Sequence, residues 1–254
     1  MRAVENRLGQ MGTKVKLNRD ELHVWLASTE IGSQRLGELE RTLSADEIAR
    51  AGRFHFERDR KNFVGRRGIL RAVLASYLET RPSALRFLYN KFGKPRLADS
   101  REVRNLSFNL SHSNEVILIA VAIDRDVGVD VEVIDNSVPS EEVAKRFFSV
   151  NEIAALEAMP QPLRLAGFFG CWARKEAYIK ARGMGLSISL DSFDVSLIQG
   201  ETATLVGTEN SSDRSNWKIE NLNIDSRYAA AVAAAGHDWN VARRNWPAEA
   251  SWPK

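Results

Sequence analysis

The chain has 254 residues, of which 44% are apolar and 27% charged, and a formal net charge of +3. These values predict a soluble globular protein with one large or two smaller domains, and no run of apolar residues is long enough for a membrane span. The small net charge gives no reason to expect a nucleic-acid-binding protein. A single cysteine, Cys171, excludes an internal disulfide, and the polar N-terminus carries no apolar signal segment, so a cytoplasmic enzyme is expected.

The first half of the chain predicts a strand, two helices and a group of short strands. Residues 1–16 are polar and are expected to form a flexible tail. Alternating apolar residues predict a strand over Glu21–Ser28. Ser44, followed three residues later by Glu47, is typical of a capped helix start. Apolar residues at helical spacing predict a long helix over about residues 59–79, which Pro82 ends. Strands are expected over residues 85–90, 106–113 and 115–123.

The second half predicts the same order of elements. It has a strand over residues 128–134, helices over 140–158 and 163–182, and strands over 192–198, 203–207, 217–224 and 228–235. The repeated order predicts an α+β protein with two similar α/β halves, residues 17–125 and 126–238. A cleft between two such halves is a preferred ligand site. Residues 239–254 are left as a C-terminal tail without an assigned role.

Two carboxylates interrupt the apolar strand Gly128–Ile134. Asp130 and Glu132 are two residues apart, so in a strand they share one face while the valines share the other. Like charges repel, and neither carboxylate is easily buried alone. An Mg²⁺ ion, which prefers oxygen ligands, would remove the repulsion. Alternatively, both carboxylates face solvent on an edge strand.

A charged helix is predicted over residues 171–182 and ends at Gly183. Trp172, Glu176 and Lys180 recur every four residues and therefore lie on one face. Glu176 could supply a third carboxylate for a metal or act as a general base, and Lys180 could neutralise phosphate charge. Alternatively, the two residues form a surface ion pair of the common helix-stabilising kind.

Three further patterns are consistent with anion binding. In the segment Asn109–Ser113, His112 lies between two hydroxyls and could bond an anion, or it could be a satisfied histidine at a strand end. In the segment Phe92–Pro95, glycine, lysine and proline could cradle a phosphate or simply form a turn. Seven arginines between residues 50 and 71 could bind phosphate or cover a solvated helix face.

The order of these motifs resembles that of the 4′-phosphopantetheinyl transferases of the pseudodimeric Sfp-like class, over about residues 43–195. The family transfers the phosphopantetheine arm of coenzyme A to a serine of an apo carrier protein and leaves 3′,5′-ADP. The resemblance implies two α/β halves related by a pseudo-twofold axis, with coenzyme A and Mg²⁺ in the cleft.

The resemblance also implies roles for individual residues. The metal ligands fall on Asp130, Glu132 and Glu176. Glu176 is in addition the candidate base, directly or through a water on the metal, while Lys180 and His112 stabilise the charge of the leaving group. Some relatives carry a lysine where this chain has Glu47, which implies altered contacts to the 3′-phosphate, for which Arg53 could substitute. The residues expected to line the coenzyme A site are Arg50, Arg53, Arg66, Gly93, Lys94, Pro95, Asn109, Ser111, His112, Asp130 and Lys180.

In the same family the acidic helices of the carrier protein dock after the metal-binding strand. Here that implies docking near Lys145, Arg146, Phe147 and Phe148, with one of the two phenylalanines in the core. The internal repeat favours a monomer, and the carrier could be an acyl, polyketide or peptidyl type. Two other functions fit parts of the pattern: an Mg²⁺-dependent phosphohydrolase built on the paired carboxylates, and a non-enzymatic anion-binding module built on the arginines. The complete ordered set of motifs favours the transferase.

Overall fold

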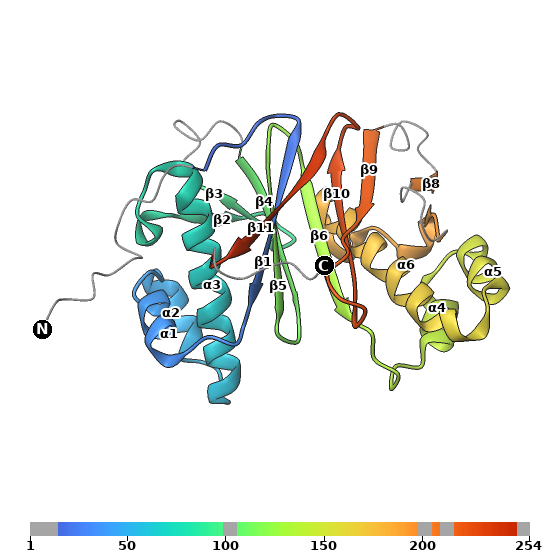
Figure 1. Ribbon diagram of the computed structural model, residues 1–254, viewed down its shortest axis with the longest axis horizontal. Coiled ribbons are helices and arrows are strands. Elements are labelled where there is room, and N and C mark those ends of the chain that lie inside the picture. The colour runs from blue at the N-terminus through green and yellow to red at the C-terminus, as the bar shows by residue number, and fades with distance from the viewer. Residues whose placement is uncertain (1–14, 99–105, 198–204, 209–215, 248–254) are drawn as a thin grey trace, which may run out of the picture.

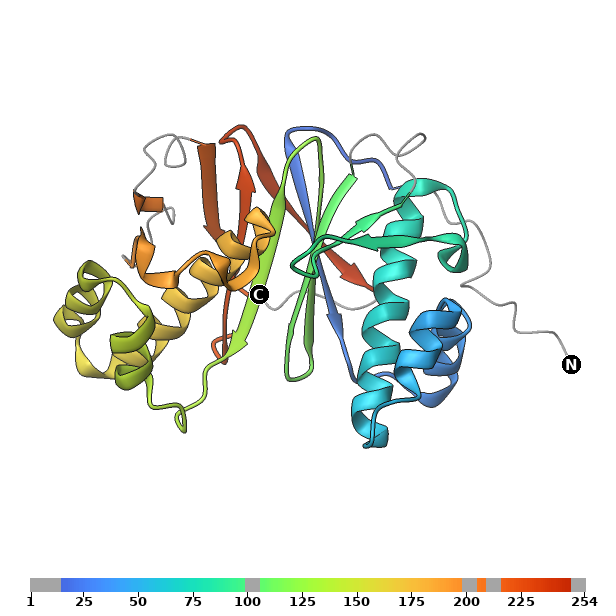
Figure 2. The ribbon, with the colours of Figure 1, turned by 180° about the vertical axis from the view of Figure 1, so that it is seen from behind.

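The computed structural model describes residues 15–98, 106–197, 205–208 and 216–247. It confirms an α+β fold with two α/β halves, whose helices lie at the outer ends and whose sheets meet in the middle (Figures 1 and 2). Most of the segment expected as an N-terminal tail, residues 1–14, lies outside the described residues. Val15 lies within them and donates its backbone N–H to Ser76 O at 2.9 Å.

The N-terminal half runs from a strand through three helices into a group of strands. The predicted strands β1 and β4 are confirmed to the residue, and the long helix begins two residues earlier than expected. Helix α1 was not predicted. The elements are β1 (Glu21–Ser28), α1 (Ser33–Glu40), α2 (Ala45–Ala51), α3 (Glu57–Leu78), β2 (Phe87–Tyr89), β3 (Pro95–Leu97), β4 (Leu106–Ser113) and β5 (Val116–Ile123).

The C-terminal half repeats this order. Its elements are β6 (Val127–Val133), α4 (Ser140–Phe147), α5 (Val150–Ala158), α6 (Gln161–Arg182), β7 (Phe193–Val195), β8 (Leu205–Thr208), β9 (Trp217–Asn221) and β10 (Tyr228–Ala235), followed by β11 (Asn240–Trp246). As predicted, Gly183 ends α6 in the left-handed conformation, with φ of 64°. Among the described helices, none is both long and apolar enough to span a bilayer.

Two sheets pack face to face between two long helices. One sheet has the order β11-β1-β5-β4 and the other the order β6-β10-β9. Valines, leucines and alanines from the facing sides of both sheets form one buried core, and α3 and α6 each cover the opposite face of one sheet with a core of their own (Figure 1). Because alternate strand residues face opposite sides, Val129 and Val131 lie in the inter-sheet core while Asp130 and Glu132 face α6.

The prediction of a single helix over residues 140–158 is wrong, because the segment forms the two helices α4 and α5. The hydroxyl of Ser149 accepts the N–H of Glu152, and the carboxylate of Glu152 accepts the N–H of Ser149. This capping box starts α5 and ends α4. The Glu152 carboxylate is buried against the ammonium of Lys175 at 2.7 Å, which fixes α5 on α6.

The C-terminal tail expected over residues 239–254 also needs correction, because residues 240–246 form strand β11. It crosses back to the N-terminal half and pairs parallel with β1, from Glu21 opposite Asn240 to Ala27 opposite Trp246. A parallel pairing more than 200 residues apart leaves no local signal in the sequence. The pairing covers the edge of β1 and ties the two halves together.

A buried polar cluster fastens β11 to β1 and α3. His23 is completely buried, and its Nδ1 lies 2.7 Å from the hydroxyl of Tyr77 and 3.1 Å from Nε of Arg244. Trp25 donates its indole N–H to the same hydroxyl at 2.7 Å. Burial and then the positive charge of Arg244 lower the pKa of His23 to about 4. The imidazole is therefore neutral in the folded protein at pH 7.

We expect this histidine to make the protein less stable in acid. Between pH 6.5 and about 4 the unfolded chain protonates His23 while the folded chain does not, so the free energy of unfolding falls as pH falls, by about 3 kcal/mol in all. Urea unfolding at pH 7 and pH 4.5 should show a smaller loss in His23→Gln than in the parent protein. Equal losses in the two proteins would contradict this role.

Candidate active site

Strand β6 and helix α6 approach each other so closely that only glycine fits at one position. A Cβ atom added to Gly128 would lie 2.1 Å from the carbonyl oxygen of Ala177 and 2.3 Å from the backbone nitrogen of Ala181. Both contacts are with the backbone of α6, so a side chain at this position could be accommodated only if the helix itself moved away. Because Gly128 has no side chain, β6 and α6 can approach this closely, and their approach sets the distance from Asp130 on β6 to Glu176 and Lys180 on α6.

Asp130 is the centre of the site. It is 1% exposed, and its Oδ1 accepts hydrogen bonds from Lys180 Nζ at 2.5 Å and Ser111 Oγ at 2.8 Å. Lys180 also donates to Ser111 Oγ at 3.0 Å. The other carboxylate oxygen, Oδ2, is buried and has no hydrogen-bond partner among the described residues. A buried oxygen of this kind is costly, and an incoming cation would satisfy it.

The two other carboxylates are held close enough to Asp130 to feel its charge. Burial, and then the charges of Asp130 and Glu176, raise the pKa of Glu132 to about 7, while Lys180 and the hydroxyl of Ser113 act in the opposite direction. Burial and the charge of Asp130 likewise raise the pKa of Glu176. The structure thus brings the predicted carboxylates into one mutually repelling group.

His112 lies beside this group at the end of β4. More than a third of the residue is exposed, yet partial burial of the ring, and then the charges of Arg66 and Lys180, lower its pKa to about 4. The nearby cations mean that α3 and α6 contribute positive charge on either side of a neutral His112. An anion bound here would be attracted by Arg66 and Lys180 and could accept a hydrogen bond from the ring.

Two buried polar residues of β4, Asn109 and Ser111, contact β6. Asn109 is buried, and its Oδ1 accepts the backbone N–H of Val129 at 2.9 Å. Ser111 is buried as well and is bonded to Asp130 and Lys180. Their polar atoms are directed at β6 and α6, so their predicted role in lining the coenzyme A site stays a prediction.

The turn between β2 and β3 reaches the opposite end of β6. Gly93 has φ of 86°, which favours glycine, and Pro95 begins β3. The ammonium of Lys94 donates to the carbonyls of Ala181 at 2.8 Å and Val127 at 3.2 Å, and burial lowers its pKa. Lys94 therefore joins the hairpin of the N-terminal half to the C-terminal half, and a contact with coenzyme A would use its remaining donor capacity.

The predicted arginines of α2 lie apart from the carboxylates. Arg50 is exposed with its guanidinium 5.3 Å from the ring centre of Phe63, and Arg53 is exposed in the loop after α2. No described bond links either to Asp130, Glu176 or Lys180. Their roles remain predictions.

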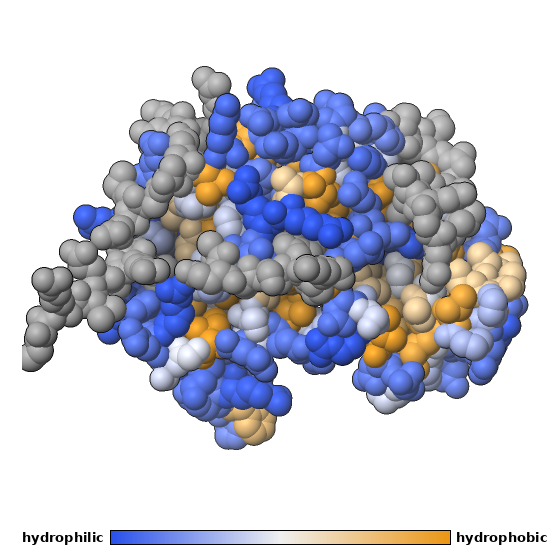
Figure 3. Space-filling view, in the orientation of Figure 1, coloured by the Kyte–Doolittle hydropathy of each residue, from blue (hydrophilic) through white to orange (hydrophobic). Residues whose placement is uncertain are grey.

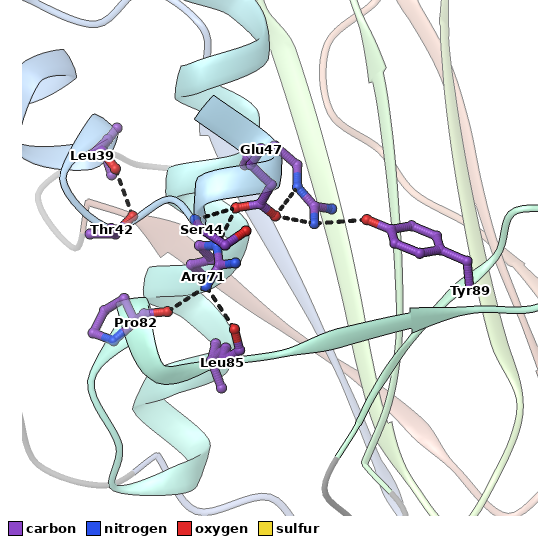
Figure 4. A network of polar contacts seen from close by, with 9 residues as sticks. Leu39, Thr42, Ser44, Glu47, Arg71, Pro82, Leu85 and Tyr89 are labelled. Atoms are coloured by element: carbon purple, nitrogen blue, oxygen red, sulfur yellow. Dashed lines mark hydrogen bonds and ion pairs between the residues drawn. The ribbon is translucent and has the colours of Figure 1, made fainter. Parts of the chain in front are cut away.

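Glu47 has a structural role that the sequence did not reveal. Its buried carboxylate accepts bonds from Arg67 and from Arg71 Nε at 2.6 Å, and Arg71 also donates to the carbonyls of Pro82 and Leu85 (Figure 4). Arg67 in turn donates to the hydroxyl of Tyr89 at 3.1 Å. Glu47 therefore neutralises two arginines that join α2 and α3 to the β2 region.

The donor set fits Mg²⁺ in its chemistry. Among the described residues, no three His, Cys, Asp or Glu side chains are already gathered around one point as a metal site. However, the orphaned Oδ2 of Asp130 and the repulsion that raises the pKa of Glu132 and Glu176 are both relieved by a divalent cation. Lys180 supplies part of that positive charge in this structure.

Ser113 is a site residue that sequence reasoning missed. Its Oγ accepts the backbone N–H of Val133 at 3.0 Å, and its hydroxyl lies close enough to Glu132 to oppose the rise in the pKa of that carboxyl that burial causes. A signal was present, because Asn109, Ser111 and Ser113 alternate and must share one face of β4.

Comparison with known proteins agrees with this geometry. Residues 126–233 match the family model "4'-phosphopantetheinyl transferase superfamily", and residues 32–124 match "4'-phosphopantetheinyl transferase, N-terminal". The chain is 38% identical to 4'-phosphopantetheinyl transferase HetI of Nostoc over 87% of this chain and 90% of the relative. It is 30% identical to 4'-phosphopantetheinyl transferase Sfp of Bacillus subtilis over 78% of this chain and 84% of the relative. It is also 30% identical to the L-aminoadipate-semialdehyde dehydrogenase-phosphopantetheinyl transferase of Xenopus laevis, over 76% of this chain and 68% of the relative. With its two halves matching the two parts of the family, the chain belongs to the 4′-phosphopantetheinyl transferases.

Proposed function

We propose that the chain transfers the phosphopantetheine arm of coenzyme A to a serine of an apo carrier protein, with Mg²⁺, and releases 3′,5′-ADP. The observation that carries the proposal is the buried Asp130, whose orphaned oxygen lies in a group of three carboxylates next to Lys180 and His112. This group combines a place for a cation with the cationic Lys180 and the neutral ring of His112, which can donate a hydrogen bond to the diphosphate of coenzyme A.

The residues of the chain have separable tasks in this reaction. The serine hydroxyl of the carrier attacks the phosphorus next to the pantetheine, and the bond from that phosphorus to the oxygen of ADP breaks. Lys180 and His112 stabilise the negative charge on the leaving oxygen. Glu176 accepts the proton of the attacking hydroxyl, directly or through a water molecule.

Asp130, Glu132 and Glu176 would hold Mg²⁺. When bound, the ion supplies positive charge that stabilises the diphosphate as its internal bond breaks. A phosphohydrolase would use the same carboxylates with water as the nucleophile, but the family match favours transfer to a carrier.

The direct test is the mass of an apo carrier protein incubated with the chain, coenzyme A and Mg²⁺. We expect a gain of one phosphopantetheinyl group, together with 3′,5′-ADP, and no gain when the metal is chelated. Acyl and peptidyl carriers should be assayed side by side, because the sequence does not choose between them. Hydrolysis of coenzyme A without any gain in carrier mass would instead support a phosphohydrolase.

The carrier is proposed to dock on α4 and its surroundings. Lys145 and Arg146 are exposed, Phe147 is half-buried with its ring edge-on to Trp172 at 5.9 Å, and Phe148 is buried in the core as one of the pair was expected to be. Figure 3 shows apolar side chains on the surface over α4 and α5. A hollow of about 300 Å³ between α4, α5 and α6 is lined by Ala144, Lys145, Ile153, Leu156, Arg164 and Phe168, among others. The floor of the hollow is apolar, and its lining also includes Glu141 and Glu157, so Lys145 and Arg164 are the groups that would meet the acidic side chains of an amphipathic helix.

Reversing the charges of this surface should weaken carrier recognition alone. We expect the double variant Lys145→Glu/Arg146→Glu to raise KM for the carrier about tenfold at low salt, because rim charges steer association, and to leave KM for coenzyme A unchanged. Arg81→Glu, which reverses an exposed charge just beyond the far end of α3, is the matched control. An unchanged KM for the carrier in the double variant would exclude this docking surface.

A further inference from the structure

The two halves meet at a seam between strands that belong to different sheets. Strand β4 is the edge of one sheet and β6 the edge of the other, and the two strands contact each other. The seam lies in the middle of the molecule, between the two groups of helices (Figures 1 and 2). Strand β4 carries His112, and β6 carries Asp130 and Glu132, so the seam sets the position of the histidine relative to the carboxylates.

At this seam, hydrogen bonds from backbone N–H groups of β6 to side chains of β4 replace the backbone hydrogen bonds that join neighbouring strands within a sheet. Asn109 Oδ1 accepts the N–H of Val129 at 2.9 Å, and Ser113 Oγ accepts the N–H of Val133 at 3.0 Å. Each bond joins residues 20 apart in the sequence, so the two strands run in the same direction. The bonds therefore satisfy two edge N–H groups of β6 that its own sheet leaves free, one on either side of the carboxylate pair.

A serine of the same face also holds a carboxylate itself. Ser111 Oγ donates to Asp130 Oδ1 at 2.8 Å. The hydroxyl of Ser113 lies close enough to Glu132 to oppose the rise in the pKa of that carboxyl that burial causes. Groups that orient the ligands of a metal in this way affect its affinity without touching it.

We propose that Ser113 is a positioning residue of the active site, whose hydroxyl fixes the backbone of β6 at Val133, next to Glu132. Asn109 acts with it by fixing β6 at Val129. The proposal rests on the proposed function in so far as Glu132 is a metal ligand, but the two bonds to the backbone of β6 are independent of that assignment.

The test compares Ser113→Ala with Ser113→Thr, which keeps the hydroxyl. The control is Ser76→Ala, which removes a half-buried hydroxyl that donates to Val73 O within α3. In Ser113→Ala we expect the amide of Val133 to exchange with solvent about tenfold faster or more. We also expect Mg²⁺ affinity, measured by calorimetry with coenzyme A present, and kcat to fall about tenfold, with KM for coenzyme A changed by less than about threefold. Ser113→Thr should recover most of the loss.

The outcomes separate this inference from the proposed function. Unchanged kcat and Mg²⁺ affinity in Ser113→Ala, with or without a lower unfolding temperature, would reduce Ser113 to a structural residue and overturn the inference. A rise in KM for coenzyme A alone, with the exchange of Val133 unchanged, would mean that the hydroxyl contacts the substrate, and would overturn it as well. If the parent protein modifies no carrier, the proposed function fails, yet amide exchange and Mg²⁺ binding still decide the role of Ser113.

Discussion

Asp130→Asn is expected to lower the rate of phosphopantetheinyl transfer roughly a thousandfold or more, which corresponds to about 4 kcal/mol of lost transition-state stabilisation. The substitution keeps the shape of the side chain and its contact with Ser111, but it removes the charge that pairs with Lys180 and would bind the cation. The measurement is kcat/KM for an apo carrier at saturating Mg²⁺, with Asp135→Asn, an exposed residue just beyond β6, as the control.

The same substitution should leave the protein folded. Asp130 is buried with one oxygen lacking a partner, which costs stability, whereas Lys180 retains 29% of its side-chain surface and can stay hydrated. We therefore expect an unfolding temperature equal to or above that of the parent protein, as is common when a strained site residue is neutralised. A variant that transfers at the parental rate would remove Asp130 from the active site.

Gly128→Ala should have the second large effect, on stability and on activity together. The added methyl would lie within 2.1 and 2.3 Å of backbone atoms of α6, so the helix must move away from β6. We expect a loss of about 3 kcal/mol or more in the free energy of unfolding. We also expect a loss of transfer at temperatures where the variant is still folded, because Glu176 and Lys180 move with α6.

Gly170→Ala is the matched control, since the nearest atom to its added methyl is the end of the Arg174 side chain at 3.9 Å. Alanine is the better helix former, so this variant should gain up to about 1 kcal/mol. Denaturant unfolding and steady-state kinetics on both variants test the argument. A Gly128→Ala protein as stable and active as the parent would show that the distance between β6 and α6 is not set by this glycine.

Local patterns in the sequence were sufficient where local forces decide the structure. The partial alternation of apolar and polar residues located β1, and the apolar and polar residues of β4 located that strand, both to the residue. The carboxylate pair, placed on one strand face from its spacing, does face α6. The missed break between α4 and α5 was also local, because Ser149 and Glu152 have the spacing of a capping box.

The remaining features depend on contacts that are distant in the sequence. The pairing of β11 with β1 joins the two ends of the chain, and the burial of Glu47 between Arg67 and Arg71 depends on how α2 packs against α3. The ion pair of Lys180 with Asp130 joins residues 50 apart. Residue types in this chain therefore indicated the chemistry of the site, but not which polar atoms are already bonded to one another.

The central claim, that Asp130, Glu132 and Glu176 bind the divalent cation of the reaction, is tested most directly by anomalous diffraction. Crystals of the full chain would be grown with coenzyme A and with Mn²⁺ in place of Mg²⁺. We predict an anomalous peak in contact with oxygens of these three carboxylates and of the diphosphate. Bound coenzyme A with no peak at these residues, or with the peak elsewhere in the chain, would contradict the account.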